Sequence, residues 1–507
     1  MYRDRDFDLG RELPGNAQAL SEDLDLETLL GTMALGDKAL YLSARVALFT
    51  SVSDPESIVY RQDVLRDCLE HSEVARELYK LTVETLEAEK SARFGFFVHS
   101  SQYPDSTLHS AVRALEVFAE MLTRLRQIAD EHAHEFSSEG FAAFFAMIKT
   151  ELDDEYLQSV REHLSALARN DVVVSVQLGQ GANGVNYVLH RSRSRGLLQR
   201  ISSLASRSEY VYRIADRDEA GARTLSELRG RALNEVANTA AQSTEHIRGF
   251  FHLLRGELAF YISALNLHAH LTAKGEPTCF PTPLAAGQRT LVTKGLYEPC
   301  LALRTQGCVV GNDIDGHDKP LIVITGANQG GKSTFLRSAG IAQLMMQCGL
   351  FVAAESLTAN VCTGVFTHFK REEDASMQSG KLDEELARMS EIADAVAPNS
   401  LVLFNESFAA TNEAEGSQIA RQIIAALLDT GTKVLLVTHM YDLAHGLQVD
   451  RATGTLFLRA ERQADQTRTF RLLEAEPLPT SYGPDVYRRI FGDAGDGSVR
   501  LAAGSLS

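Results

Sequence analysis

The sequence predicts a multidomain protein in which a mostly α-helical region, with a small β-containing insertion, precedes an α/β domain. Apolar residues recur at helical spacing through most of residues 23–168 and again from 224 to 270. Strand-like segments interrupt that pattern between about 171 and 215. After about residue 275, apolar strands alternate with amphipathic helices, which is typical of a parallel sheet covered by helices.

The helical pattern begins after a polar leader over residues 1–22, which we expect to be flexible. Apolar side chains then recur in phase within 58–86 and within 108–128, so both stretches predict helix. Pro-Asp at 104–105 and Ser-Ser-Glu-Gly at 137–140 predict breaks between helices. The first region is therefore expected to be a series of helices.

The insertion at about 171–215 combines short strands with a cluster of arginines. The segments at 172–176, 187–189 and 210–214 predict strands. The arginines of the cluster are Arg191, Arg193, Arg195, Arg200 and Arg207. Because the chain has a formal net charge of −17, any contact with nucleic acid must come from a local basic patch such as this one. A solvated charged loop is the alternative interpretation.

The α/β domain is organised around a strand, a glycine-rich loop and a helix. Four apolar residues at 321–324 predict a strand that is buried on both faces. Gly326, Gly331, Lys332 and Ser333 then fit the phosphate-loop (P-loop) pattern G-x-x-x-x-G-K-[ST]. In this pattern backbone N–H groups surround an anion, the lysine reaches the terminal phosphates and the serine hydroxyl ligates Mg²⁺. The residues expected to contact a nucleoside triphosphate are Gly326, Ala327, Asn328, Gln329, Gly330, Gly331, Lys332, Ser333 and Thr334.

Alternating strands and helices continue beyond this loop. Further strands are expected at 350–352, 359–369, 400–404 and 433–437. Helices are expected from near 332 to 349, at 382–396 and at 419–431. Two of these strands deliver polar residues to the same edge of the sheet, where an open parallel sheet binds its ligands. Glu406 is the candidate to polarise the water that attacks the γ-phosphate, and His439 is the candidate to contact that phosphate. The alternative interpretations are a solvent-facing acid and a structural histidine.

Taken together, these residues resemble the ATPase domain of the MutS family of DNA mismatch-repair proteins. The family loop T-G-P-N-M-G-G-K-S-T compares with Thr-Gly-Ala-Asn-Gln-Gly-Gly-Lys-Ser-Thr at 325–334. Asn405-Glu406, Thr438-His439 and the closing Ser-Tyr-Gly at 481–483 follow in the family's order. The resemblance implies a helical core (lever) domain at 23–275 with a clamp at about 171–215. It also implies an ABC-like P-loop ATPase domain at 276–492 and a tail at 493–507.

The chain departs from the family pattern at several positions. The acid on the Mg²⁺ side of the site, usually Asp, is Asn405, so the expected metal ligands are Ser333, Asn405 and Glu406. Asp374, Ser379 and Gly380 resemble the signature loop that reaches the partner's nucleotide, but Leu382 replaces its usual serine. Phe118-Ala-Glu120 matches the Phe-x-Glu wedge of the mismatch-reading domain in letters only. Because Phe118 falls on an apolar helical stripe, we interpret it as a core residue.

The resemblance implies an ATPase that uses ATP and Mg²⁺, forms a homodimer and closes its helical arms on mismatched, branched or recombining DNA. We expect it in the cytoplasm, nucleoid-associated when bound to DNA, with repair proteins as partners. A nucleotide-binding scaffold with weak hydrolysis is the alternative, favoured by Asn405 and Leu382. An ABC-type or SMC-like ATPase would need a membrane partner or sustained heptads. The six cysteines show no zinc spacing, and no apolar run approaches the ~18 residues of a membrane span.

Overall fold

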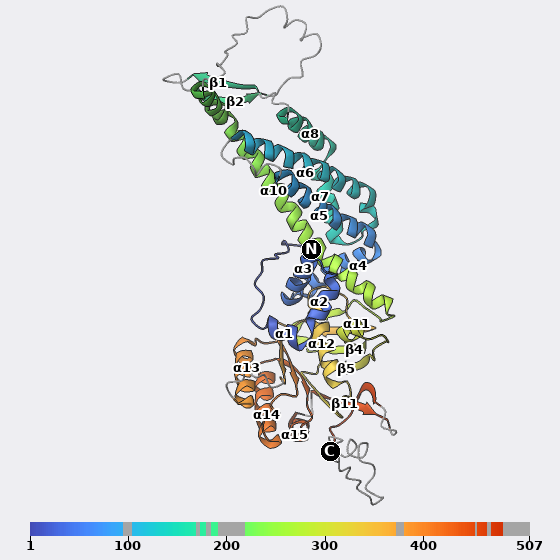
Figure 1. Cartoon of the computed structure of the whole chain (residues 1–507). Coiled ribbons are helices and arrows are strands. Elements are labelled where there is room, and N and C mark those ends of the chain that lie inside the picture. Colours follow the sequence, from blue (N-terminus) through green and yellow to red (C-terminus); the bar gives the residue numbers. More distant parts are fainter. Residues whose placement is uncertain are drawn as a thin grey trace, which may run out of the picture. The chain divides into compact units, whose positions relative to one another are not determined.

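The computed structural model describes residues 1–94, 104–168, 173–178, 184–190, 219–371, 380–451, 454–463 and 468–479 of the 507-residue chain. Over these residues the protein is mostly helical and contains three β-sheets (Figure 1). The chain divides into two compact units. The helical unit comprises residue 1, residues 3–7 and residues 66–262, and the sheet unit comprises residue 2, residues 8–65 and residues 263–507.

The helical unit is built from long helices that each bury an apolar face. Its elements are α5 (Ser72–Phe94), α6 (Pro104–His132), η1 (Ala133–Glu135), α7 (Glu139–Glu151), α8 (Asp154–Ala168), β1 (Val173–Leu178), β2 (Gly184–His190) and most of α10 (Glu219–Ala273). Phe118 of α6 is fully buried and stacks on Phe251 of α10, with 5.8 Å between the ring centroids. The interpretation of Phe118 as a core residue is therefore confirmed.

The structure confirms the breaks expected near 104 and 137, and hydrogen bonds explain the second. α6 begins at Pro104, and α7 begins directly after Ser138. The buried Asp67 carboxylate accepts hydrogen bonds from the backbone N–H groups of Ser137 and Ser138 at 3.1 and 2.8 Å. The Ser138 hydroxyl then accepts from the Phe141 N–H at 3.3 Å. These contacts satisfy donors that the start of a helix leaves without intrahelical partners.

The helix expected over 224–270 forms as the longer helix α10, which runs without interruption from Glu219 to Ala273. Its glycines do not break it, because packing along a helix face outweighs the weak helix propensity of single glycines. Among the described residues, no helix combines the length and the apolar character that crossing a membrane requires.

Two of the three strands expected in the insertion are present. β1 and β2 pair antiparallel, and their register shifts between Ser175 and Gln177. The strand expected at 210–214 lies outside the described residues.

The sheet unit contains a six-stranded sheet in the order β12-β11-β6-β10-β9-β8. Its strands are β6 (Leu321–Thr325), β8 (Val365–Phe369), β9 (Leu401–Asn405), β10 (Lys433–Val437), β11 (Thr455–Arg462) and β12 (Arg468–Glu474). The strands from β11 to β8 are parallel, and β12 pairs antiparallel with β11. β6, β8 and β10 are buried at every position, as expected for parallel strands covered on both faces.

The helices expected after the phosphate loop are present and cover this sheet. They are α12 (Lys332–Gln347), α13 (Lys381–Ala395) and α14 (Glu413–Asp429), and α15 (Tyr441–Arg451) follows β10. Leu321 and Val323 of β6 belong to one apolar cluster with residues of α13, α14 and α15. α12 contacts β8, β9 and β10. The alternation predicted from the sequence therefore builds the expected parallel sheet.

A second, four-stranded sheet corrects one prediction. Its strands, in spatial order, are β3 (Thr282–Leu284), β7 (Ser356–Asn360), β4 (Leu291–Leu296) and β5 (Asn312–Gly316), with η3 (Ala286–Gln288) after β3. The single strand predicted at 359–369 is wrong, because β7 and β8 belong to different sheets. Gln347 holds the turn between them: its Oε1 accepts from the Cys362 N–H and its Nε2 donates to the Cys362 carbonyl, both at 2.9 Å. The prediction of a strand at 350–352 is also wrong. This segment forms an isolated β-bridge between Val352 and Cys279.

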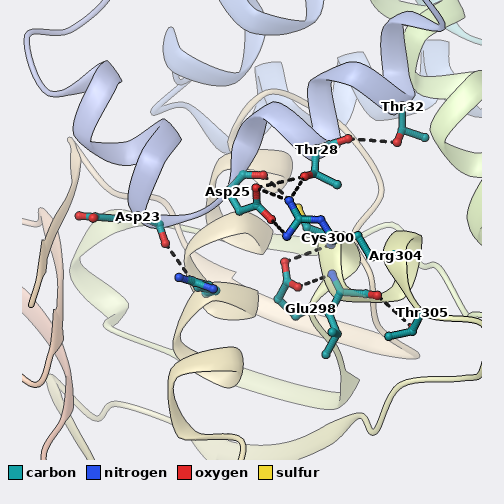
Figure 2. Close-up of polar contacts among 10 residues, drawn as sticks. Asp23, Asp25, Thr28, Thr32, Glu298, Cys300, Arg304 and Thr305 are labelled. Atoms are coloured by element: carbon teal, nitrogen blue, oxygen red, sulfur yellow. Dashed lines mark hydrogen bonds and ion pairs between the residues drawn. The ribbon is translucent and has the colours of Figure 1, made fainter. Parts of the chain in front are cut away.

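Short helices near the N-terminus pack within the sheet unit. They are α1 (Ala17–Asp23), α2 (Leu26–Ala34), α3 (Lys38–Phe49) and the beginning of α4 (Pro55–Glu70). Figure 2 shows Asp25, between α1 and α2, and Thr28 of α2 bonded to Arg304 of α11 (Pro299–Arg304). Arg337 of α12 donates to the Asp23 carbonyl at 2.9 Å, and Arg304 of α11 forms an ion pair with Asp25 at 2.7 Å. Glu298 caps α11 by accepting from the Cys300 N–H at 3.0 Å.

All six cysteines lie among the described residues as free thiols. Four are buried: Cys68, Cys300, Cys348 and Cys362. Burial raises the pKa of Cys348 to about 12 and the pKa of Cys362 to about 11, which suppresses the reactive thiolate. Cys279 is partly buried, and Cys308 is exposed.

Candidate nucleotide site

The phosphate loop follows β6 at the carboxyl edge of the six-stranded sheet. Gly326 and Gly331 adopt positive φ values of 110° and 91°, a region that favours glycine. A Cβ on Gly326 would lie 2.9 Å from the Ala460 backbone nitrogen, and one on Gly330 would lie 2.7 Å from the Ala460 Cβ. Glycine is therefore required here both by backbone conformation and by the close approach of β11.

Lys332 is the first residue of α12, and its side chain folds back onto the loop. Its ammonium donates hydrogen bonds to the carbonyls of Gly326 at 2.9 Å and Ala327 at 3.0 Å. Burial lowers the pKa of Lys332, and the Glu406 carboxylate acts in the opposite direction. A buried ammonium that bonds to two neutral carbonyls would be stabilised further by an anion, because hydrogen bonds between charged groups are stronger than those to neutral acceptors.

Ser333 and Asn405 come from different elements and meet at this edge. The Ser333 hydroxyl at the start of α12 donates to the Asn405 Oδ1 at the end of β9, at 2.8 Å. Both are oxygen donors of the kind that Mg²⁺ takes, and the Glu406 carboxylate follows Asn405 directly. The donor set therefore suits a magnesium ion shared with phosphate oxygens. Among the described residues, no group of three or more His, Cys, Asp or Glu side chains forms a separate metal cluster.

Glu406 and His439 also face each other. The Glu406 N–H donates to the Val437 carbonyl of β10 at 2.9 Å, and the Thr438 N–H donates to the Ile324 carbonyl of β6 at 3.1 Å. The His439 Nδ1 lies 3.9 Å from the Glu406 Oε1, with both side chains partly exposed. The ends of β6, β9 and β10 thus bring together, at one edge of the sheet, the residues that are candidates to contact phosphate, polarise water and bind Mg²⁺.

The turn that carries Glu406 has an unusual backbone. Glu406 has a φ of 55° and Phe408 has a φ of 61°, although neither is glycine. Bulky residues in the left-handed region are rare and need support from surrounding structure. The Phe408 carbonyl also packs against Gly416, where a Cβ would lie only 2.3 Å from its oxygen. No glycine in the sequence marks this turn.

The structure adds contacts that the sequence analysis missed. Arg468 of β12 donates to the Gln329 side chain of the phosphate loop at 2.5 Å. The Phe470 backbone lies against Gly331, where a Cβ would lie 3.3 Å from the Phe470 oxygen. The apolar run at 456–458 could have predicted a strand, but nothing in the sequence indicates that the β11–β12 hairpin flanks the loop.

Several predicted site residues lie outside the described residues. These are Asp374 and Ser379 of the expected signature loop, the arginines between 191 and 207, and the Ser-Tyr-Gly segment at 481–483. Gly380 is described as the residue before α13, with an ordinary φ of −64°. Their roles remain predictions.

Comparison with known proteins yields two family profiles and several relatives. The profile of the MutS2 N-terminal domain matches residues 53–274, and the profile of MutS domain V matches residues 322–491. An endonuclease MutS2 from Pelotomaculum thermopropionicum is 28% identical over 374 residues, covering 71% of this chain and 45% of that protein. A DNA mismatch repair protein MutS from Shouchella clausii is 32% identical over 191 residues, covering 37% of this chain and 22% of that protein.

An endonuclease MutS2 from Bacillus velezensis is 35% identical over 163 residues, covering 32% of this chain and 20% of that protein. In each of these three comparisons, this chain spans less than half the length of the relative. The profile of MutS domain V covers the phosphate loop, Asn405, Glu406 and His439.

Proposed function

Because this chain belongs to the MutS family, we propose that it is an ATP-dependent DNA-binding protein of DNA repair or recombination control. ATP binding and hydrolysis would drive closure of its helical arms on mismatched or branched DNA. The name of the Shouchella clausii relative, a DNA mismatch repair protein, supports the assignment to repair. The nucleotide part of the proposal rests on the geometry of the sheet edge.

One observation carries the nucleotide assignment: Ser333 meets Asn405 while Lys332 is held inside the glycine loop. The Lys332 ammonium exchanges its two carbonyl partners for the β- and γ-phosphates, assisted by the N-terminal N–H groups of α12. The Glu406 carboxylate accepts a hydrogen bond from the attacking water and orients it toward the γ-phosphate. His439 donates to a γ-phosphate oxygen as charge develops there.

Ser333, Asn405 and Glu406 would hold the Mg²⁺ that accompanies ATP. When bound, the ion neutralises negative charge that develops on the phosphate oxygens. Asn405 is a neutral ligand, so it attracts a cation less than a carboxylate would. The proposed enzyme is therefore an ATPase with slow turnover.

The wider architecture is part of the same proposal. A helical core (lever) domain at 23–275, with a clamp at about 171–215, would bind DNA, and a P-loop ATPase domain at 276–492 would bind ATP. Two copies would form a homodimer in which Asp374, Ser379 and Gly380 of one copy reach the nucleotide of the other. The arginines from 191 to 207 would contact DNA phosphates in a chain with a net charge of −17.

Lys332→Ala tests the nucleotide site. Loss of a charged hydrogen-bond donor should weaken ATP binding about 100-fold, measured by equilibrium titration with a fluorescent ATP analogue. Lys294→Ala is the matched control, because Lys294 is exposed and its ion pair with Glu355 lies on the four-stranded sheet. A folded Lys332→Ala protein with unchanged ATP affinity would contradict the assignment.

The DNA interface is tested by changing Arg191, Arg193 and Arg195 together to Glu. DNA affinity should fall for all sequences alike, and the log–log salt slope should flatten by about 0.9 for each phosphate that is no longer neutralised. ATP turnover without DNA should remain at the wild-type level, because the described strands of the six-stranded sheet all come from residues 321–474 of the chain. Unchanged affinity and slope would identify the arginines as a solvated loop.

A nucleotide-binding scaffold with weak hydrolysis, acting through protein partners, is the second candidate. The observation that favours it is the neutral Asn405 amide beside Ser333. Asn405→Asp should lower the Mg²⁺ concentration needed for half-maximal turnover and raise turnover itself. If wild-type protein binds ATP but shows no turnover with or without DNA, the scaffold is the better assignment.

A further inference from the structure

The left-handed turn at 406–408 is held from outside by His368, a buried residue of β8. The His368 Nδ1 lies 2.8 Å from the Ser407 hydroxyl, and its Nε2 lies 2.9 Å from the Glu385 carbonyl. Its ring stacks on the Phe408 ring, with 5.1 Å between centroids and 16° between planes. One imidazole therefore contacts both residues that follow Glu406.

The hydrogen-bond partners fix the arrangement of protons in this network. The Glu385 carbonyl can only accept, so the His368 Nε2 carries a proton and donates it. In the neutral ring Nδ1 is then an acceptor, and the one proton of the Ser407 hydroxyl is shared between Nδ1 and the His368 carbonyl oxygen, which can only accept. The same hydroxyl lies 2.5 Å from the His368 carbonyl, so Ser407 contacts both the ring and the backbone of β8. His368 and Ser407 are both buried, which shields these bonds from water.

His368 also connects the turn to α13. Glu385 is buried in the first turns of that helix. Burial raises the pKa of its carboxyl group, and a hydrogen bond from the Phe408 backbone opposes that increase. α13 is further anchored by Arg388, which donates to the Phe369 carbonyl of β8 at 2.9 Å. The turn, β8 and α13 thus form one connected group of contacts beside the candidate nucleotide site.

We propose that His368 and Ser407 are positioning residues that hold Glu406 in line with the attacking water and link its presentation to α13. This inference rests on the proposed ATPase function. Two non-glycine residues at positive φ would relax toward ordinary backbone angles without such contacts. Relaxation would turn the Glu406 carboxylate away from its water while leaving the phosphate loop, which lies on a different strand, unchanged.

Ser407→Ala in the full chain tests the positioning role. It removes the hydroxyl that bonds His368 with little change in volume. We expect kcat to fall about tenfold while ATP affinity stays within about twofold of wild type, because the removed bond orients Glu406 rather than the phosphates. Ser407→Thr restores a hydroxyl and should recover most of the missing turnover. A merely structural role would not produce this division between kcat and affinity.

A double-mutant cycle with Glu406→Gln separates the two proposals. If Ser407 acts through Glu406, then Ser407→Ala should have no further effect on single-turnover hydrolysis in the Glu406→Gln background. Equal losses in both backgrounds, or an unchanged kcat for Ser407→Ala, would overturn the positioning role. If Glu406→Gln alone hydrolyses ATP at the wild-type rate, the catalytic assignment of Glu406 fails, and that result is visible without any change at Ser407.

His368→Gln provides a second route to the same measurement. The amide keeps a donor and an acceptor but loses the stacked ring. It should lower kcat with ATP affinity unchanged, and its effect should likewise disappear in the Glu406→Gln background. If Ser407→Ala fails to fold, the His368→Gln cycle decides the question by the same criteria.

Discussion

The phosphate loop and the turn at 406–408 lie at the same sheet edge but obtain their backbone conformations in different ways. Gly326 and Gly331 reach positive φ without steric cost, and neighbouring Ala460 leaves no room for a larger residue at Gly326. Glu406 and Phe408 reach positive φ at a cost and depend on contacts from β8 and α13. At these glycines the loop conformation is determined locally, although Gln329 of the loop has a φ of 61° and accepts a hydrogen bond from Arg468 of β12. The conformation of the turn is determined by tertiary structure.

This difference determines which part of the site is sensitive to structural changes in other elements of the fold. The glycines of the loop keep their conformation as long as β6 and α12 are intact, whereas Gln329 also depends on Arg468 of β12. A turn held by His368 responds to any displacement of β8 or α13, because its local sequence would prefer another conformation. Affinity for ATP and the rate of hydrolysis should therefore be separable by mutation.

The largest effect should come from Glu406→Gln, which removes the carboxylate and keeps the shape of the turn. General-base catalysis contributes about 10²–10⁴ in rate, so kcat should fall by about 10³ while ATP binding is retained. Single-turnover hydrolysis and a binding titration measure the two quantities in the same preparation. If kcat and affinity fall together, the proposed separation between loop and turn is wrong.

The next largest effect should appear in the pH dependence of the free energy of unfolding. Burial, together with the charge of nearby Arg388, lowers the pKa of His368 to about 4, whereas the unfolded value is about 6.5. Between pH ~4 and ~6.5 the unfolded chain binds a proton at His368 that the folded chain does not bind. The stability that comes from the neutral His368 is therefore fully present above pH ~6.5 and is lost as the pH falls toward ~4. The contribution amounts to about 3 kcal/mol.

Urea denaturation across this pH range, compared between wild type and His368→Gln, measures that contribution. The wild-type free energy of unfolding should fall more steeply than that of the variant, which cannot bind this proton. Parallel curves for the two proteins would show that His368 does not remain neutral in the fold.

Gly330→Ala should disturb the locally determined loop. The added Cβ would lie 2.7 Å from the Ala460 Cβ and 3.0 Å from the Ala327 oxygen, so the loop or β11 must move. Such overpacking costs about 1–3 kcal/mol, and ATP affinity should fall with stability. Gly307→Ala is the control, because nothing lies within 4 Å of a Cβ added there. Ala460→Gly should partly rescue Gly330→Ala, and a failure to rescue would argue against this contact.

The smallest expected effect is the difference in stability between two substitutions of Phe408. Both Phe408→Gly and Phe408→Ala remove a buried ring, but alanine at a φ of 61° remains strained and glycine does not. The Phe408→Gly protein should therefore be more stable than the Phe408→Ala protein by about 1 kcal/mol. At Phe404 in β9 the order should reverse, because glycine weakens an extended strand. Thermal unfolding of the four variants checks both orders.

The same contrast explains how much could be predicted from the sequence. Apolar periodicity predicted α6, α10, α13 and the strands β6, β9 and β10, because each pattern reports a buried face. It merged β7 with β8, because Gln347 makes the turn between them through side-chain bonds that have no local signal. For the site, residue spacing indicated the loop, Glu406 and His439. It could not indicate His368, because a histidine inside an apolar strand looks the same whether or not it supports a turn.

One consequence of the burial of the thiols concerns chemical labelling. Cys68, Cys300, Cys348 and Cys362 are buried, and Cys279 is partly buried with a pKa raised to about 11. Cys308 is exposed in the connection between α11 and β5. A maleimide dye should therefore attach to the native chain predominantly at Cys308, without engineered cysteines. The sheet unit thus carries its own attachment point for a fluorescent reporter.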